Sequence, residues 1–267
     1  MVNWSMKKSY GCGDLAEIVR ILRHPGGCPW DQEQTHASIR RNLLEEAYEA
    51  AEAIDSGDVD ALREELGDVL LQVYFHTSIE EDAGRFTLDD VADGVCKKLI
   101  YRHPHVFGEV NVRSTQEVLS NWEELKKREK HQATHADELD AVARTLPALW
   151  RAEKVQKKAA RAGAPWNGWD AVMDKLAEEL EEIRAAASGE GDLAEELGDL
   201  LFVAVCACAE AGVDPEQALH ANIDKDIARF RRVEELAAGQ GKTTDKLSRE
   251  EFMALWAQAK DQLKQAH

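Results

Sequence analysis

The chain has 267 residues and a formal net charge of −18, with 31% charged, 44% hydrophobic and 6% aromatic residues. This length suggests one or two domains, since a domain typically has about 100–200 residues. The acidic balance argues against nucleic acid and anionic membranes as partners, because both need a basic surface, but it permits a small anionic substrate held by local cations. A composition rich in Ala, Leu and Glu predicts a soluble, all-α protein.

The cysteines and the apolar runs indicate the cellular compartment of the protein. Five cysteines, an odd number without a CxxC pair, are typical of a reducing compartment. No N-terminal stretch has the apolar region of a signal peptide. The longest apolar run, 200–209, is about half a membrane span. We therefore expect a cytoplasmic protein without a membrane segment.

The predicted elements form two similar halves. In the first half, CPWDQEQT at 28–35 precedes two apolar-periodic segments that are joined by the turn DSGDVD at 55–60. In the second half, APWNGWDA at 164–171 precedes two such segments joined by ASGEGD at 187–192. Two more helices follow in each half. This organisation indicates duplication of a whole domain rather than a solenoid.

Between the halves, the polar stretch 126–142 lacks strong periodicity. We interpret 131–143 as a linker that joins a domain at 1–130 to a domain at 144–267. No run of alternating apolar residues is long enough to predict a strand. The expected fold is therefore all-α, with two tandem helical bundles.

The pentapeptide EELGD occurs in both halves, at 64–68 and at 195–199, each time inside a helical apolar pattern. A glycine in a helix interior costs about 1 kcal/mol relative to alanine. Gly67 falls on the flank of the helix away from Glu65, so it is not on the side of the expected ligands. We interpret this glycine as a point where a neighbouring helix approaches closely, and we expect Gly67→Leu to damage folding or assembly first.

Four helices share one design, in which an apolar anchor is followed by acids three and six positions later. At 100° per residue both acids lie on one margin of the apolar stripe, which is expected to be buried. Short turns make each pair of helices an antiparallel hairpin, with axes about 8–10 Å apart. Four acids are therefore expected to converge in each half: Glu46, Glu49, Glu65 and Asp68, and then Glu179, Glu182, Glu196 and Asp199.

Such convergence requires a cation, because two like charges 4 Å apart repel by about 4 kcal/mol at an effective dielectric near 20. The ligands are all oxygen atoms, which favours Mg²⁺ or Mn²⁺ over Zn²⁺. The alternative, solvated acids on amphipathic helices, explains a single ExxE but not the matching phase within each hairpin. Glu45 and Glu178 lie nearer to solvent and are candidates for orienting a catalytic water.

Cations and tryptophans recur at i, i+4 spacing, which places each pair on one helix face. Alone, such a pair is typical of a solvated face, and a lone tryptophan is typical of a core. In a chain of charge −18, cations in phase in both halves indicate phosphate clamps beside a metal cluster. Whether the tryptophans pack against a base or close the bundle stays open. The residues are Lys98, Arg102, Trp122 and Lys126, and then Lys225, Arg229, Trp256 and Lys260.

Three segments strongly resemble the MazG nucleoside triphosphate pyrophosphohydrolases, namely GCPWDQEQTHASIRRNLLEEAYE at 27–49, EELGDVLLQV at 64–73 and RHPHVFG at 102–108. The pattern EExxE followed by ExxD is the hallmark of that family. The resemblance covers nearly the whole chain, in the two-domain form of the family. It implies an all-α, usually dimeric enzyme that hydrolyses nucleoside triphosphates to monophosphates and pyrophosphate with Mg²⁺.

The resemblance also assigns roles and shows departures. It makes the eight acids metal ligands, and the second half matches the Lys…Arg and Trp…Lys positions of the family. KDIARF at 225–230 has Asp226 where the family tends to have an aromatic residue, which is expected to alter packing or base preference. PWN at 165–167 departs from the PWD of the family.

The predicted reaction is Mg²⁺-assisted attack of water between the α and β phosphates, with Lys225, Arg229 and Lys260 stabilising the charge. No P-loop is present, so phosphate binding would rest on side chains and metal. Both halves keep the complete set of acids, cations and tryptophan, which leaves open whether one or both halves are active. The alternatives are a scaffold or regulator that binds a cation for folding only, and a narrow dUTP or dCTP pyrophosphatase.

Overall fold

The computed structural model describes residues 4–129, 132–164 and 166–265, and every regular element in these ranges is helical. The predicted all-α class is confirmed. Packing divides the chain into two compact units, Met1–Lys126 and Lys127–His267. The boundary predicted between residues 130 and 131, and Pro165 of the second PW motif, lie outside the described residues.

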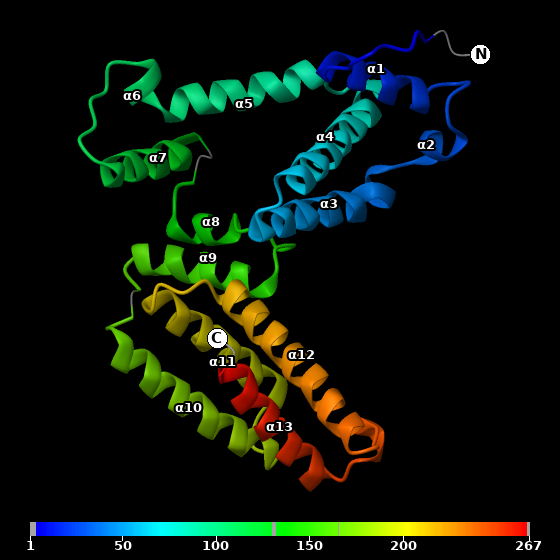
Figure 1. The fold of residues 1–267 in the computed structure, drawn as a ribbon. Coiled ribbons are helices and arrows are strands. Elements are labelled where there is room, and N and C mark those ends of the chain that lie inside the picture. The colour runs from blue at the N-terminus through cyan, green and yellow to red at the C-terminus, as the bar shows by residue number, and fades with distance from the viewer. Residues whose placement is uncertain (1–3, 130–131, 165, 266–267) are drawn as a thin grey trace. The chain divides into compact units, whose positions relative to one another are not determined.

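The first unit is built on an antiparallel hairpin, drawn in blue and cyan in Figure 1, of α3 (His36–Ser56) and α4 (Val59–Asp82). The hairpin turns at Gly57, whose φ of 69° lies in the left-handed region that glycine adopts without strain. Asp58 then starts α4, because its carboxylate accepts two backbone N–H hydrogen bonds of the first turn. This tight turn brings the end of α3 beside the start of α4.

Of the other helices of the first unit, α1 and α5 contact this hairpin through α4. α1 packs on α4, and a small core of Val19, Ile39, Tyr74 and Phe75 joins α1, α3 and α4. The remaining helices are α1 (Cys12–Arg23), α2 (Pro29–Glu33), α5 (Leu88–Arg102), α6 (Pro104–Phe107) and α7 (Thr115–Glu129).

The second unit repeats the hairpin with α10 and α11, and Asp192 caps α11 as Asp58 caps α4. α9 packs on α11 and also contacts α12, which pairs with α13 (Figure 1). One core cluster forms around Val172 and Cys206, and another around Val233. The helices are α8 (His135–Asp140), α9 (Ala148–Arg161), α10 (Trp169–Ala187), α11 (Leu193–Glu210), α12 (Pro215–Gly239) and α13 (Arg249–Gln265), with the 3₁₀ turn η1 (Thr244–Lys246).

The stretch that the sequence predicts as a linker contains the helix α8. A capping box starts it, in which Thr134 and Asp137 each accept a hydrogen bond from the backbone N–H of the other. The helix packs on α9, and its buried Glu138 forms a 2.9 Å ion pair with Lys127. Six residues are too few for an apolar period to show in the sequence, so the pattern could not reveal this helix.

The apolar stripes that were expected to be buried are largely exposed. In α4, Leu66 is 53% exposed, and Leu70 and Val73 are also exposed. In α11, Leu197 and Leu201 are exposed at the corresponding positions. Within one chain each hairpin therefore buries only part of the face that its periodicity marks as apolar.

Within the single chain, the close helix approach predicted at Gly67 does not occur. A Cβ atom built at this glycine, or at Gly198 in the second unit, meets no described atom within 4 Å. Neither glycine needs a positive φ, since both lie inside regular helices.

Two further features concern the cysteines and the helices. All five cysteines are free thiols. In the described part of the chain, no helix combines the length and the apolar character needed to cross a membrane.

Candidate carboxylate–metal sites

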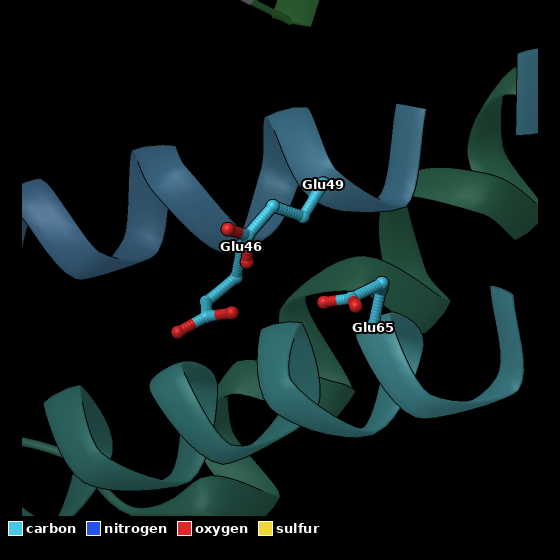
Figure 2. Close-up of side chains that lie close together, drawn as sticks. All are labelled: Glu46, Glu49 and Glu65. Carbon is cyan, nitrogen blue, oxygen red and sulfur yellow. The ribbon is translucent and has the colours of Figure 1, made fainter. Parts of the chain in front are cut away.

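The predicted acids gather on the hairpin of the first unit. Figure 2 shows Glu46 and Glu49 on α3 and Glu65 on α4, with their carboxylates in the space between the two helices. One oxygen from each carboxylate lies within 4.8 Å of the other two. We call these three residues the N-terminal cluster.

The hairpin of the second unit also gathers three acids, one from its first helix and two from its second. Glu179 on α10 and Glu196 and Asp199 on α11 offer oxygens that lie within 4.8 Å of one another. We call these residues the C-terminal cluster. Each unit thus brings three of its four predicted acids to ligand distance, and the fourth, Asp68 or Glu182, stands outside the group.

The fourth acid still acts on each cluster through its charge. Partial burial raises the pKa of Glu46, and the carboxylates of Asp68, Glu49 and Glu65 raise it further. Burial likewise raises the pKa of Glu196, with Glu182 as the strongest contributor among its charged neighbours. Both clusters therefore concentrate negative charge.

Glu179 provides the best test of whether a cation fits. It is 2% exposed, and its Oε2 atom has no hydrogen-bond partner among the described residues. A buried, unpartnered carboxylate oxygen is costly, and a cation would satisfy it. Carboxylate oxygens alone suit Mg²⁺ or Mn²⁺, so the residues present fit the expected ion.

A lysine that the sequence analysis missed lies against the C-terminal cluster. Lys175 Nζ lies 2.8 Å from Glu178 Oε1, 3.0 Å from Glu179 Oε1 and 3.7 Å from Glu182 Oε2. Hydrogen bonds to Glu178 and Glu179 raise the pKa of Lys175. Its i, i+4 spacing from Glu179 was a signal in the sequence that could have found it.

The two acids proposed to orient a water are in surface ion pairs. Glu45 accepts a 2.7 Å hydrogen bond from Arg41, and Glu178 pairs with Lys175. Both glutamates are about half exposed, and neither belongs to a cluster. Their carboxylates are therefore held by cations in this conformation.

In the first unit, the predicted cations meet the predicted tryptophan. The Arg102 guanidinium lies 5.2 Å from the centroid of the Trp122 ring, and Lys126 Nζ lies 4.6 Å from it. These are cation–π distances. Arg102 is 8% exposed, whereas Lys98 is half-buried. In this unit the tryptophan thus binds the cations of its own chain.

In the second unit, the corresponding residues have different partners. Arg229 Nη1 forms a 2.9 Å ion pair with Asp226, the residue that departs from the family pattern. Trp256 stacks on Phe252 with ring centroids 5.9 Å apart and packs on the core around Val233. Lys225 and Lys260 are exposed.

A second network that sequence reasoning missed ties the start of α3 to the end of α4. His36 Nδ1 lies 2.7 Å from His76 Nδ1, and the other ring nitrogen of His36 contacts Glu80. Arg85 donates a 2.7 Å hydrogen bond to Glu80. Hydrogen bonds from Arg85 and His36 lower the pKa of Glu80 to about 2. His36 and Glu80 are 44 positions apart, which no local pattern can reveal.

The fold and the two clusters define a class of all-α proteins that gather acids between the antiparallel helices of tandem hairpins. The family model described as MazG nucleotide pyrophosphohydrolase domain matches residues 34–107. The model described as phosphoribosyl-ATP pyrophosphohydrolase matches residues 150–225. The chain belongs to the MazG family, as the resemblance of its motifs predicted.

Relatives cover most of the chain. The nucleoside triphosphate pyrophosphohydrolase of Escherichia coli (strain K12) is 41% identical over 253 residues, which are 93% of this chain and 96% of that protein. The nucleoside triphosphate pyrophosphohydrolase/pyrophosphatase MazG of Thermotoga maritima is 40% identical over 247 residues, which are 92% of this chain and 94% of that protein. The similarity therefore extends over both units.

Proposed function

We propose that the protein hydrolyses nucleoside triphosphates, ribo- or deoxyribonucleotides, to monophosphates and pyrophosphate with Mg²⁺, and that Mn²⁺ can replace Mg²⁺. Family membership supports the reaction class. The observation that carries the metal dependence is the buried Glu179 oxygen without a partner in a group of three carboxylates. The five free thiols fit action in the cytoplasm.

The proposed roles follow from the arrangement of the side chains. The three carboxylates of each cluster hold the ion, and Asp68 or Glu182 adds charge beside it. When bound, the ion would offset the charge of the triphosphate and activate a water for attack. Lys225 and Lys260 are exposed and so can reach phosphate oxygens, and Arg229 would join them on leaving Asp226.

The exposed apolar faces support a second copy of the chain as partner. On α12, Leu219, Ile223 and Ile227 recur every four residues, and each is nearly half exposed. With the exposed stripes of α4 and α11, they form apolar surfaces of the kind that symmetric dimers bury. We propose a homodimer through these faces. Analytical ultracentrifugation should show a dimer that Ile223→Asp weakens, and a monomeric wild-type chain would contradict the proposal.

The activity is tested by measuring pyrophosphate release from the common ribo- and deoxyribonucleoside triphosphates, with Mg²⁺ and with EDTA. Phosphoribosyl-ATP belongs in the same assay, because the second unit matches a family model of that name. We expect Mg²⁺-dependent release from several nucleotides. Release from dUTP or dCTP alone would favour a narrow pyrophosphatase. Stabilisation by Mg²⁺ without any release would favour a scaffold and refute the proposal.

A further inference from the structure

We propose that Lys175 is a built-in counter-cation that makes the C-terminal cluster bind divalent ions more weakly than the N-terminal cluster. The inference rests on the proposed function, because it concerns the same carboxylates. It predicts that the two clusters of one chain fill at different concentrations of free metal ion.

The contacts of Lys175 show that it competes for a ligand. Its ammonium lies 3.0 Å from Glu179 Oε1, and the Glu179 side chain is only 3% exposed. Water cannot compensate the charge of so buried a carboxylate, so the lysine is its main counter-ion. The pair involves Oε1 only, and Oε2 has no partner. The lysine thus compensates the carboxylate in part and leaves Oε2 without a partner.

The N-terminal cluster has no equivalent cation. Four positions before Glu46, where the second unit has Lys175, the first unit has the neutral Asn42. Among the ion pairs of the described residues, none involves Glu46, Glu49 or Glu65. This cluster therefore keeps its full negative charge for an incoming ion.

Both ways in which an ion can enter the C-terminal cluster oppose binding. If the ion takes Glu179 from Lys175, the ion pair is lost. If the ammonium stays, it lies close to a divalent cation and repels it. Because displacement and repulsion act in the same direction, the lysine lowers the affinity of the cluster in either case.

The test is a Mn²⁺ titration followed by electron paramagnetic resonance, which reports free Mn²⁺ without any need for activity. It uses the full chain in two backgrounds. Glu46→Gln with Glu49→Gln isolates the C-terminal cluster, and Glu179→Gln with Glu196→Gln isolates the N-terminal cluster. We expect a Kd about tenfold higher for the C-terminal cluster, which corresponds to about 1.4 kcal/mol.

Exchange of the residue four positions before each cluster should move the affinities in opposite directions. Lys175→Met should lower the Kd of the isolated C-terminal cluster about tenfold, and Asn42→Lys should raise that of the N-terminal cluster by a similar factor. Lys175→Arg keeps the charge and should preserve weak binding. Lys154→Met, an exposed site on α9, is the control for net charge and should leave both Kd values unchanged.

An unchanged Kd for the C-terminal cluster after Lys175→Met, with Mn²⁺ still bound, would refute the counter-cation role and leave the proposed function intact. Circular dichroism spectra that match the wild type would show that the variant is folded. Failure of the wild-type chain to bind Mn²⁺ at all would instead overturn the metal-dependent function, and this inference with it.

Discussion

The two hairpins carry acids at the same spacing, but their carboxylate clusters differ in membership and in electrostatic surroundings. In the first unit the residue one turn before the cluster is Asn42, and the following acid, Glu46, is half-buried. In the second unit that residue is Lys175, and Glu179 is almost fully buried. The helical phase of the acids therefore places them on one side of each hairpin, whereas a neighbour one turn away changes the net charge around them.

The corresponding arginines of the two units also have different partners. Arg102 lies over Trp122, whereas its counterpart Arg229 pairs with Asp226. The position that holds Asp226 in the second unit holds Leu99 in the first. At this position the second unit supplies an ion-pair partner for its arginine, whereas the first unit has an apolar residue. Duplicated helices can keep their motif and still present it to substrate differently.

The largest expected effect is the loss of activity when carboxylates are removed from both clusters. The combination Glu46→Gln with Glu179→Gln should reduce pyrophosphate release at least about 100-fold, because each cluster loses a central carboxylate. Each single variant, assayed at saturating Mg²⁺, then shows which unit is active. The control pairs Glu52→Gln with Glu181→Gln, on the same helices but outside the clusters. Full activity in the double variant would show that neither cluster takes part in catalysis.

The next prediction concerns acid stability, which should differ between the units. Arg85 and His36 hold the pKa of Glu80 at about 2, well below its ordinary value of 4.5. Since the folded pKa is lowered, Glu80 stabilises the first unit above pH 4.5, and this contribution disappears as the pH falls toward 2. The second unit has Ala207 and Ala211 where the first has His76 and Glu80, so it lacks the contribution of this network.

Urea unfolding between pH 5 and pH 2.5, followed by tryptophan fluorescence, measures the difference. Glu80→Gln should be less stable than the wild type at pH 5, and the gap should narrow as the pH falls. Glu52→Gln, at an exposed site, should follow the wild type throughout. A constant gap between Glu80→Gln and the wild type would show that the carboxylate titrates normally.

A smaller effect should follow from release of Arg229. Asp226→Asn removes an ion pair between a half-exposed carboxylate and a largely buried arginine, and the freed guanidinium should lower KM by up to about fivefold. The measurement is steady-state kinetics of pyrophosphate release, with kcat and KM determined separately. Asp224→Asn makes the same charge change at an exposed neighbouring site and should leave KM unchanged. A raised KM would mean that Asp226 orients the arginine for substrate.

The smallest expected effect concerns the glycine inside a helix that the two units share. Gly67→Ala and Gly198→Ala should each stabilise the chain by up to about 1 kcal/mol, because alanine favours the helix and the added Cβ meets no described atom within 4 Å. Chemical denaturation measures both. Destabilisation of either variant at a protein concentration that favours dimers, but not at high dilution, would place that glycine in a subunit contact.

Much of the fold and of the site was predictable because helix periodicity is local. The acids three and six positions after an apolar anchor lie on one side of a helix whatever surrounds it, so Glu46 and Glu65 could be expected to meet. The helix α8 was not predictable, because it is too short for a period and depends on its capping box and on packing against α9.

The sequence by itself determined the helical class, the two hairpins, the acids in register and the family, since all of these depend on neighbours within a few turns. Only the tertiary structure decided that Leu66 and Leu201 stay exposed, that Asp68 and Glu182 stand outside their clusters, and that Lys175 contacts Glu179. The physical reason is that burial and ion pairing depend on which helices face each other and on how far each side chain reaches, and a helical period does not encode either.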